Sequence, residues 1–193
     1  LIVGRALVTG KGAPRSFAKG QALLRPLADK GSAGAAILLA MSLKSNDPES
    51  AYRYAMIAGK GGHVQAPALM DRLEQNLTTK QVLNIQLEQA SQGQFKKTKG
   101  NGFVPIVELR SRAQSSLRGR GVFRNYANAY YWALLGEAAG DLSAAGVAEE
   151  IEGRMRFRGT EASNVWQKIA EDTQYKVLSN WLDANYPDKL GAE

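Results

Sequence analysis

Residue types that carry catalysis or hold metals are scarce in this chain. Its 193 residues include one histidine, His63, and no cysteine. The usual histidine and cysteine ligands of zinc therefore cannot be assembled, and a cysteine nucleophile is excluded. A serine triad would have to use His63, which follows Gly62 where a helix is expected to begin. We interpret His63 as a helix-start residue and predict no catalytic residue, no metal site and no cofactor.

Two other patterns suggest chemistry but fit it poorly. The stretch GKGAPRSF lacks the spacer and the Gly-Lys-Ser/Thr ending of a phosphate-binding loop, and AGKGGH follows a predicted helix rather than a strand. Glu149, Glu150 and Glu152 lie on one predicted helix, whereas a glycosidase needs two carboxyl groups held across a cleft. A solvated acidic helix face is the simpler interpretation. A glycan-cleaving enzyme with a cleft in a helical superhelix is the alternative.

The net charge of +7 comes from one basic segment. Between Phe95 and Arg124, eight basic residues accompany a single acid, Glu108; removing them from the totals of 25 and 18 leaves 17 basic and 17 acidic residues elsewhere. The eight are Lys96, Lys97, Lys99, Arg110, Arg112, Arg118, Arg120 and Arg124. Clustered charge steers association, so these residues are the candidates for binding a partner. That partner would be an acidic protein or peptide.

Two alternatives to this interpretation of the basic segment stay open. One is an ordinary solvated linker and helix face, and the other is an electrostatic adaptor for an anionic polymer. Nucleic acid is disfavoured, because Phe103 and Phe123 do not make the aromatic ladder on which bases stack.

The elements that position these residues follow an internal repeat. Three segments align without gaps: SFAKGQALLRPLADKGSAGA from Ser16, DPESAYRYAMIAGKGGHVQA from Asp47, and NYANAYYWALLGEAAGDLSA from Asn125. Each begins with a residue type that caps helix N-termini, because its side chain accepts a hydrogen bond from a free N–H of the first turn. The repeat therefore predicts three helices that begin at equivalent places.

Small residues predict where each of these helices ends. A glycine follows each cap by fifteen residues, at Gly31, Gly62 and Gly140. Glycine just past a helix end takes the left-handed conformation that closes the last turn. Four residues later stands an alanine, which would let the next helix pack closely; these are Ala35, Ala66 and Ala144. One apolar position is also shared on the helix face, by Leu23, Tyr54 and Trp132.

Paired glycines precede two of the three caps. Gly10-Lys11-Gly12 lies six residues before Ser16, and Gly119-Arg120-Gly121 lies six residues before Asn125, whereas the second segment lacks this loop. The third copy, residues 119–141, reads GRGVFRNYANAYYWALLGEAAGD. Its paired glycines, helix cap, alanine, tryptophan and final glycine-aspartate resemble the Sel-one-like repeat, a relative of the tetratricopeptide repeat. The resemblance covers roughly residues 1–76 and 103–155.

The resemblance implies a right-handed stack of antiparallel helix pairs that holds other proteins, often at bacterial envelopes, without an active site. We therefore expect an all-α fold, an α-solenoid of about nine or ten helices that binds a protein or peptide on its curved surface. A periplasmic or secreted bacterial location is favoured over the cytoplasm. No apolar run approaches the roughly 20 residues that a membrane span needs.

Capping helices are expected at the ends of two repeat blocks within a single domain, residues 1–193. The first block covers 1–91, a basic linker covers 92–102, and the second block covers 103–193.

Thr78 and Gln81 have the spacing of a capping box, ahead of an apolar face made by Val82, Leu83, Ile85 and Leu87. One helix is expected from Thr160 and a separate last helix over about 174–185. The aromatic residues expected in the core of this cap are Trp166, Tyr175 and Trp181.

Overall fold

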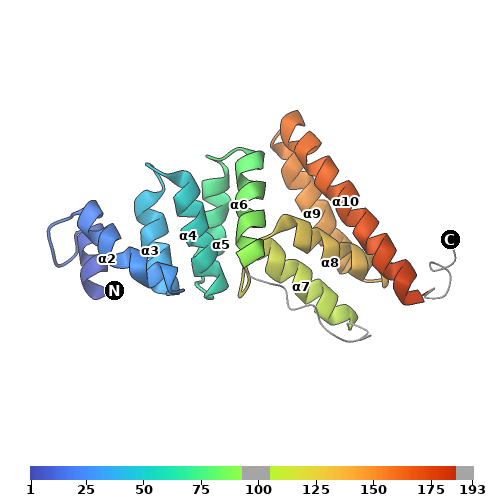
Figure 1. The fold of residues 1–193 in the computed structure, drawn as a ribbon, viewed down its shortest axis with the longest axis horizontal. Coiled ribbons are helices and arrows are strands. Elements are labelled where there is room, and N and C mark those ends of the chain that lie inside the picture. The colour runs from blue at the N-terminus through green and yellow to red at the C-terminus, as the bar shows by residue number, and fades with distance from the viewer. Residues whose placement is uncertain (93–104, 186–193) are drawn as a thin grey trace. The chain divides into compact units, whose positions relative to one another are not determined.

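The chain is all-helical in the residues that its computed structural model describes, 1–92 and 105–185 (Figure 1). These residues form ten α-helices and no strand, which confirms the predicted fold class and helix number. The helices are α1 (Ile2–Thr9), α2 (Phe17–Asp29), α3 (Ala33–Leu43), α4 (Pro48–Lys60), α5 (Ala66–Glu74), α6 (Thr79–Gln92), α7 (Ile106–Arg118), α8 (Tyr126–Ala138), α9 (Leu142–Phe157) and α10 (Thr160–Asn185). None of the described helices is long and apolar enough to serve as a membrane span.

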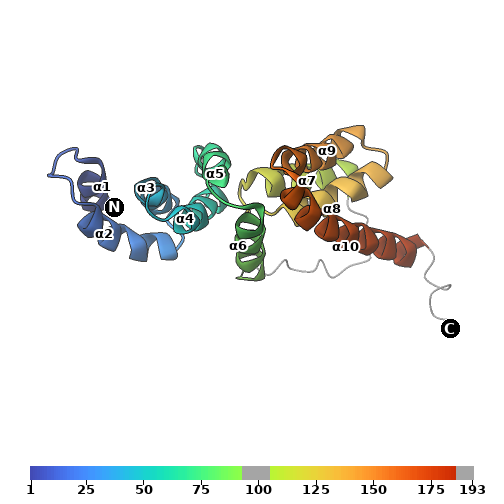
Figure 2. The same cartoon turned by 90° about the horizontal axis from the view of Figure 1, so that it is seen from above.

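The helices belong to two compact units. The first consists of Leu1–Gly93 together with Arg118–Arg124, and the second of Gln94–Leu117 together with Asn125–Glu193. In the first unit each helix from α1 to α4 contacts the next one along the chain, and in the second unit α9 and α10 both contact α8 (Figure 2). The short segment Arg118–Arg124 packs with the first unit. All but the first residue of the predicted linker lies outside the described residues.

The three predicted helix starts are confirmed. Helices α2, α4 and α8 each contain 13 residues and begin directly after Ser16, Asp47 and Asn125. The carboxylate of Asp47 accepts a hydrogen bond from the backbone N–H of Ser50, and the amide oxygen of Asn125 accepts one from the N–H of Asn128. Ser16 has the extended backbone of a cap but makes no such side-chain bond. The fold keeps the capping conformation in all three copies.

The three closing glycines all take the left-handed conformation. Their φ angles are +88° at Gly31, +81° at Gly62 and +89° at Gly140. In each copy the residue after the glycine donates its backbone N–H to a carbonyl five residues earlier, the bond that defines a Schellman closure. These bonds run from Ser32 to Leu27, from His63 to Ala58 and from Asp141 to Gly136, at 3.0, 2.9 and 2.9 Å. The sequence repeat is therefore also a repeat of backbone geometry.

The equivalent alanines lie where two helices meet. Ala35, Ala66 and Ala144 are each completely buried. In the third copy, a methyl group on Gly136 would lie 2.6 Å from the side chain of Ala144, a distance at which two carbons overlap. The small residues thus set how closely α8 and α9 approach each other.

The C-terminal part of the chain differs from the prediction. Residues 160–185 form one continuous helix, α10, of 26 residues rather than two helices. No glycine or proline interrupts this stretch, so nothing in the backbone forces a break. Trp166 is buried as predicted, but Tyr175 and Trp181 are 74% and 41% exposed, and their assignment to the core was wrong.

The capping box before α6 is confirmed. The backbone N–H of Thr78 donates to the Gln81 side chain at 2.8 Å, and the N–H of Gln81 donates back to the Thr78 hydroxyl at 3.2 Å. Val82, Leu83 and Ile85 are buried on the apolar face that follows. Leu87 was expected on the same face and is exposed.

Replacing Gly59 by alanine tests the closest backbone approach in the first unit. A Cβ atom at Gly59 would lie 2.4 Å from the carbonyl oxygen of Gly119, and the Gly59 carbonyl accepts the N–H of Gly121. We expect Gly59→Ala to lower the free energy of unfolding by about 2 kcal/mol or more, since overpacking forces the backbone to shift. Gly146→Ala is the control, because open space surrounds Gly146 within α9, and it should stabilise by up to about 1 kcal/mol. Urea denaturation measures both, and equal effects would contradict the packing described.

Candidate functional site

The described arginines of the predicted basic set belong to both units. Arg110 and Arg112 lie on α7 in the second unit, whereas the arginines of Arg118–Arg124 belong to the first unit. Arg118 is half-buried and Arg120 is exposed. The three lysines of the predicted set, Lys96, Lys97 and Lys99, lie outside the described residues.

Arg124 is an internal residue, so its assignment as a partner-binding residue was wrong. Its side chain is completely buried, and Nη1 donates to Asp71 Oδ1 at 2.8 Å and to Glu74 Oε1 at 2.9 Å. Glu74 also accepts the hydroxyl hydrogen of Tyr52 at 2.7 Å, and Tyr52 in turn accepts from Gln86. The carboxylates of α5 compensate the buried guanidinium, which a charge count along the sequence cannot reveal.

Arg112 belongs to an aromatic patch on the second unit. Its guanidinium carbon lies 4.7 Å from the centre of the Trp132 ring, and its Nε donates to Glu108 at 3.0 Å. Tyr131 meets Trp132 edge-on with ring centres 5.1 Å apart, and the Tyr131 hydroxyl accepts from Asn180 at 2.7 Å. Both rings are half-buried. We call Arg112, Tyr131 and Trp132 the Trp132 patch.

In the first unit an arginine also lies over the aromatic ring at the repeat position of Trp132. Tyr54 holds the same place on α4, and the guanidinium carbon of Arg25 lies 6.0 Å from the centre of its ring. The Tyr54 hydroxyl donates to Asp29, and burial together with this bond raises its pKa above the ordinary value. Each unit therefore has one aromatic ring with an arginine over it at this repeat position.

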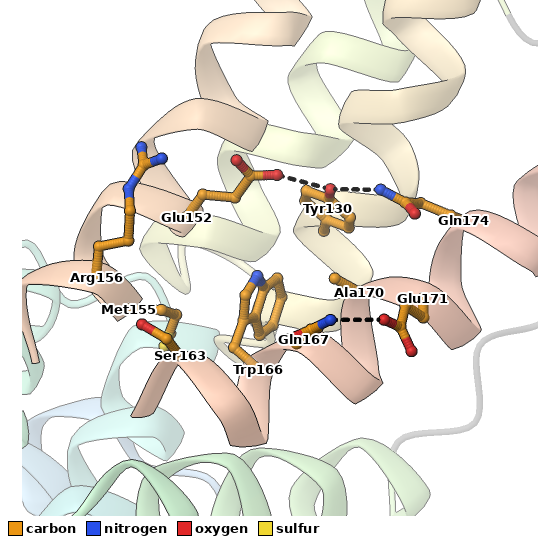
Figure 3. A pocket seen from close by; sticks show the side chains of 10 residues that line it. All are labelled: Tyr130, Glu152, Met155, Arg156, Ser163, Trp166, Gln167, Ala170, Glu171 and Gln174. Carbon is orange, nitrogen blue, oxygen red and sulfur yellow. Dashed lines mark hydrogen bonds between the residues drawn. The ribbon is translucent and has the colours of Figure 1, made fainter. Parts of the chain in front are cut away.

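A cavity of about 310 Å³ lies among α8, α9 and α10 of the second unit (Figure 3). Helix α8 contributes Tyr130 to its lining, and α9 contributes Glu152, Met155 and Arg156. Helix α10 contributes Ser163, Trp166, Gln167, Ala170, Glu171 and Gln174. Its volume is at the small end of the range for ligand pockets, so it suits a single side chain or a comparably small group.

Tyr130 orders the polar side of this cavity. Its hydroxyl donates to Glu152 Oε1 at 2.8 Å and accepts from Gln174 Nε2 at 3.1 Å (Figure 3). Burial first, and the bond to the Glu152 carboxylate second, raise the pKa of Tyr130 to about 12. Tyr130 therefore stays protonated over the physiological range and holds the Glu152 side chain in one orientation.

Trp166 forms the inner wall of the cavity and carries an unpaired donor. The residue is 4% exposed, and its ring meets Tyr130 edge-on with ring centres 5.4 Å apart and planes at 81°. No acceptor among the described residues bonds its indole nitrogen Nε1. Leaving such a buried donor unpaired costs about 1–3 kcal/mol. Figure 3 shows this nitrogen on the edge of the ring that is turned toward Glu152 and Arg156.

The rim of the cavity is polar and exposed. Gln167 donates to Glu171 at 2.9 Å along α10, and the Arg156 side chain extends from α9 on the opposite side (Figure 3). Two carboxylates therefore accompany one guanidinium around the opening. Among the described residues, no three histidine, aspartate or glutamate side chains gather as a metal site would require. The arrangement is suited to hydrogen bonding a small polar group above an apolar wall.

Sequence reasoning missed this cavity, although it named Glu152 and Trp166, two of the residues that line it. The predicted acidic face is exposed at Glu149, but Glu150 pairs with Arg154 and Glu152 accepts from Tyr130. His63 does not begin a helix as expected, because α5 begins three residues later at Ala66 and its cap position is Gln65. The Nδ1 atom of His63 accepts the backbone N–H of Gln65 at 3.3 Å within the preceding turn. No spacing links Tyr130, Glu152 and Trp166 along the chain, because three different helices supply them.

Comparison of Arg124→Ala with Arg120→Ala separates structural from surface arginines in the same segment. Removing Arg124 leaves Glu74 buried without this cation, which should cost about 3–5 kcal/mol of unfolding free energy. Arg120 is exposed, so its removal should change stability by less than about 0.5 kcal/mol. Chemical denaturation gives both values. A small effect at Arg124 would mean that the buried ion pair does not form.

The Tyr130 hydroxyl is expected to titrate near pH 12. Tyrosine ionisation is followed by the ultraviolet absorbance of the phenolate in wild type and in Tyr130→Phe. The variant should lack one tyrosine from the most alkaline phase of the titration. Because the pKa of Tyr130 is higher in the folded chain than in the unfolded chain, the protonated hydroxyl stabilises the fold. This stabilisation is complete below about pH 10 and is lost as the pH rises to about 12. A missing phase centred near pH 10 would contradict the buried bond to Glu152.

Comparison with known proteins identifies no relative. No protein-family model, no curated protein and no solved structure matches the chain. The resemblance to the Sel-one-like repeat therefore rests on the residues that carry it and stays a prediction.

Proposed function

We propose that the chain is a scaffold or adaptor that binds a protein or peptide on a face of its stacked helices. The repeated closures at Gly31, Gly62 and Gly140 support this, because repeats that share one geometry stack into extended binding surfaces. The resemblance to the Sel-one-like repeat implies the same role and a right-handed superhelix. It also implies a bacterial envelope location, which we keep as part of the proposal.

The Trp132 patch carries the proposal. Tryptophan, tyrosine and arginine are the residue types that contribute most to binding energy at protein interfaces. Here the guanidinium of Arg112 is held by both Trp132 and Glu108, and Tyr131 is held by Asn180. Side chains already fixed in the free protein lose less conformational entropy when a partner binds. The patch is therefore both chemically suited and preorganised.

The charge of the partner follows from the cations near the patch. Arg110 Nε lies 3.8 Å from Asp141 and remains 39% exposed, and Arg112 remains 30% exposed. A partner with a carboxylate beside an apolar side chain would match both the arginines and the ring of Trp132. We propose an acidic peptide segment with aromatic or aliphatic residues.

The two other functions receive less support. A glycan-cleaving enzyme would use the glutamates of the cavity, yet Tyr130 is the proton donor in its bond to Glu152, an arrangement that orients a carboxylate rather than supplying an acid. An adaptor for an anionic polymer would need exposed, unneutralised cations, whereas Arg124 is completely buried and Arg112 is paired with Glu108.

A peptide library displayed on phage tests the proposal, because it samples many acidic and apolar peptide sequences at once. Peptides enriched on the wild-type chain are synthesised, and their dissociation constants are measured by fluorescence polarisation. We expect Trp132→Ala and Arg112→Ala each to weaken binding by more than about tenfold, as removal of a central interface residue does. Lys168→Ala, at an exposed position of α10, is the matched control and should bind normally.

Two results would contradict this function. One is a library that enriches no peptide on the wild-type chain, and the other is enriched peptides whose affinity is unchanged in both patch variants. Binding to poly-glutamate that falls steeply with salt and ignores Trp132→Ala would instead identify the anionic-polymer adaptor.

A further inference from the structure

We propose that the cavity among α8, α9 and α10 is a second binding site, which receives the side-chain carboxamide of a glutamine or asparagine in a bound polypeptide. The proposal rests on the proposed function in one respect only, that the ligand is a polypeptide. It uses different residues from the Trp132 patch. It follows from two residues that line the same small cavity. Trp166 has an indole N–H without an acceptor among the described residues, and the Glu152 carboxylate has lone pairs left for a ligand.

The donor is the indole N–H of Trp166. Trp166 lines the cavity, its indole nitrogen is shielded from solvent, and no described residue accepts the hydrogen bond of this nitrogen. Native proteins pair nearly all such groups with protein or with ordered water, and we assign the acceptor here to a ligand in the adjacent cavity. A carbonyl oxygen is the simplest acceptor.

The acceptor is the carboxylate of Glu152. Tyr130 is its hydrogen-bond partner among the described residues and occupies Oε1, which leaves lone pairs of the carboxylate for a ligand N–H. A primary carboxamide carries a carbonyl oxygen and an NH₂ group on the same carbon. It can therefore bond Trp166 and Glu152 through two separate atoms, whereas a ketone offers no donor and an alcohol must make both bonds with one oxygen.

The charge of the cavity selects an amide over an acid. Glu152 and Glu171 both line it, against the single cation of Arg156. A carboxylate ligand would meet two like charges and offer no hydrogen to Glu152. A neutral amide avoids this repulsion and has the same shape.

The walls favour a peptide side chain over an acetamido sugar. Met155 is buried and Ala170 half-buried in the lining, and they fit the methylene groups of a glutamine stem. Sugars bind on exposed aromatic faces, but Trp166 is 4% exposed and its ring packs edge-on against Tyr130. The tryptophan thus contributes its nitrogen rather than a stacking platform.

Entry of the ligand requires a rim side chain to move. The Trp166 nitrogen is shielded from solvent, while Arg156 and Gln167 at the rim are exposed. Rotamer changes of exposed side chains commonly accompany binding. The described backbone of the three helices need not change.

Three matched probes test the proposal on the intact chain: N-acetyl-glutamine methylamide, N-acetyl-methionine methylamide and N-acetyl-glutamate methylamide. They share the backbone amides and differ only in the side-chain end. Binding is followed through the indole N–H signals of ¹⁵N-labelled protein, with the Trp166 signal assigned by its loss in Trp166→Phe. We expect the glutamine probe to shift the Trp166 signal and to bind about tenfold more tightly than the other two, because only it satisfies both groups.

Two variants and one control connect the effect to the cavity. Trp166→Phe keeps an aromatic ring but removes the donor, and Glu152→Gln removes the charged acceptor while its amide oxygen can still accept from Tyr130. Each should weaken the glutamine probe about tenfold or more, with circular dichroism confirming an unchanged fold. Trp181→Phe, at an exposed position of α10, should bind like wild type.

Three results would overturn the proposal. They are equal binding of the three probes, a shift of the Trp132 or Trp181 signal without one of Trp166, and binding of N-acetylglucosamine in preference to the glutamine probe. None of them decides the proposed function, because peptides selected on the Trp132 patch are measured with different residues and a different readout. Loss of patch binding with retained glutamine binding would likewise contradict the proposed function alone.

Discussion

The fold depends on a backbone closure that only a few residues can make. At the end of α2, α4 and α8 the chain must reverse within a few residues, and it does so through a left-handed glycine followed by a bond back across the last turn. A side chain at that position would strain the backbone. The closure is the same in three places, and the alanine four residues after each glycine is buried. The next helix begins two residues after the glycine in the first and third copies and four residues after it in the second. Both candidate sites are built on this frame.

The sequence predicted the local features because their causes are local. A cap, a closing glycine and a capping box act within one or two turns, so Asp47, Gly62 and Thr78 could each be interpreted from their neighbours. The errors arose where tertiary packing decides. Arg124 was assigned to the surface with its charged neighbours, yet its partners Asp71 and Glu74 lie 53 and 50 residues away along the chain. Tyr175 has a helical spacing to other apolar residues, but nothing in the sequence showed that its side of α10 stays in solvent.

The cavity lies beyond what one sequence can predict. Trp166 was expected in the core and is buried there, and the hydrophobic pattern of its helix was sufficient for that. Whether its indole nitrogen has a partner depends on how three helices cross, since Tyr130 and Glu152 come from two others. A sequence does not show whether a buried donor has an acceptor. The structure shows it, because it gives the hydrogen-bond partners of each polar atom around the cavity.

The placement of Arg118–Arg124 has a consequence for where the chain can be cut. This short stretch is covalently part of the later half of the chain, yet it supplies the first unit with a cation that two of its carboxylates surround. A gene break between α6 and α7 would leave those carboxylates without their counter-ion, and a duplicated later half would carry a buried-type arginine with no acids to receive it. A cut of the chain at this boundary would therefore leave the first unit with buried negative charge that lacks its cation.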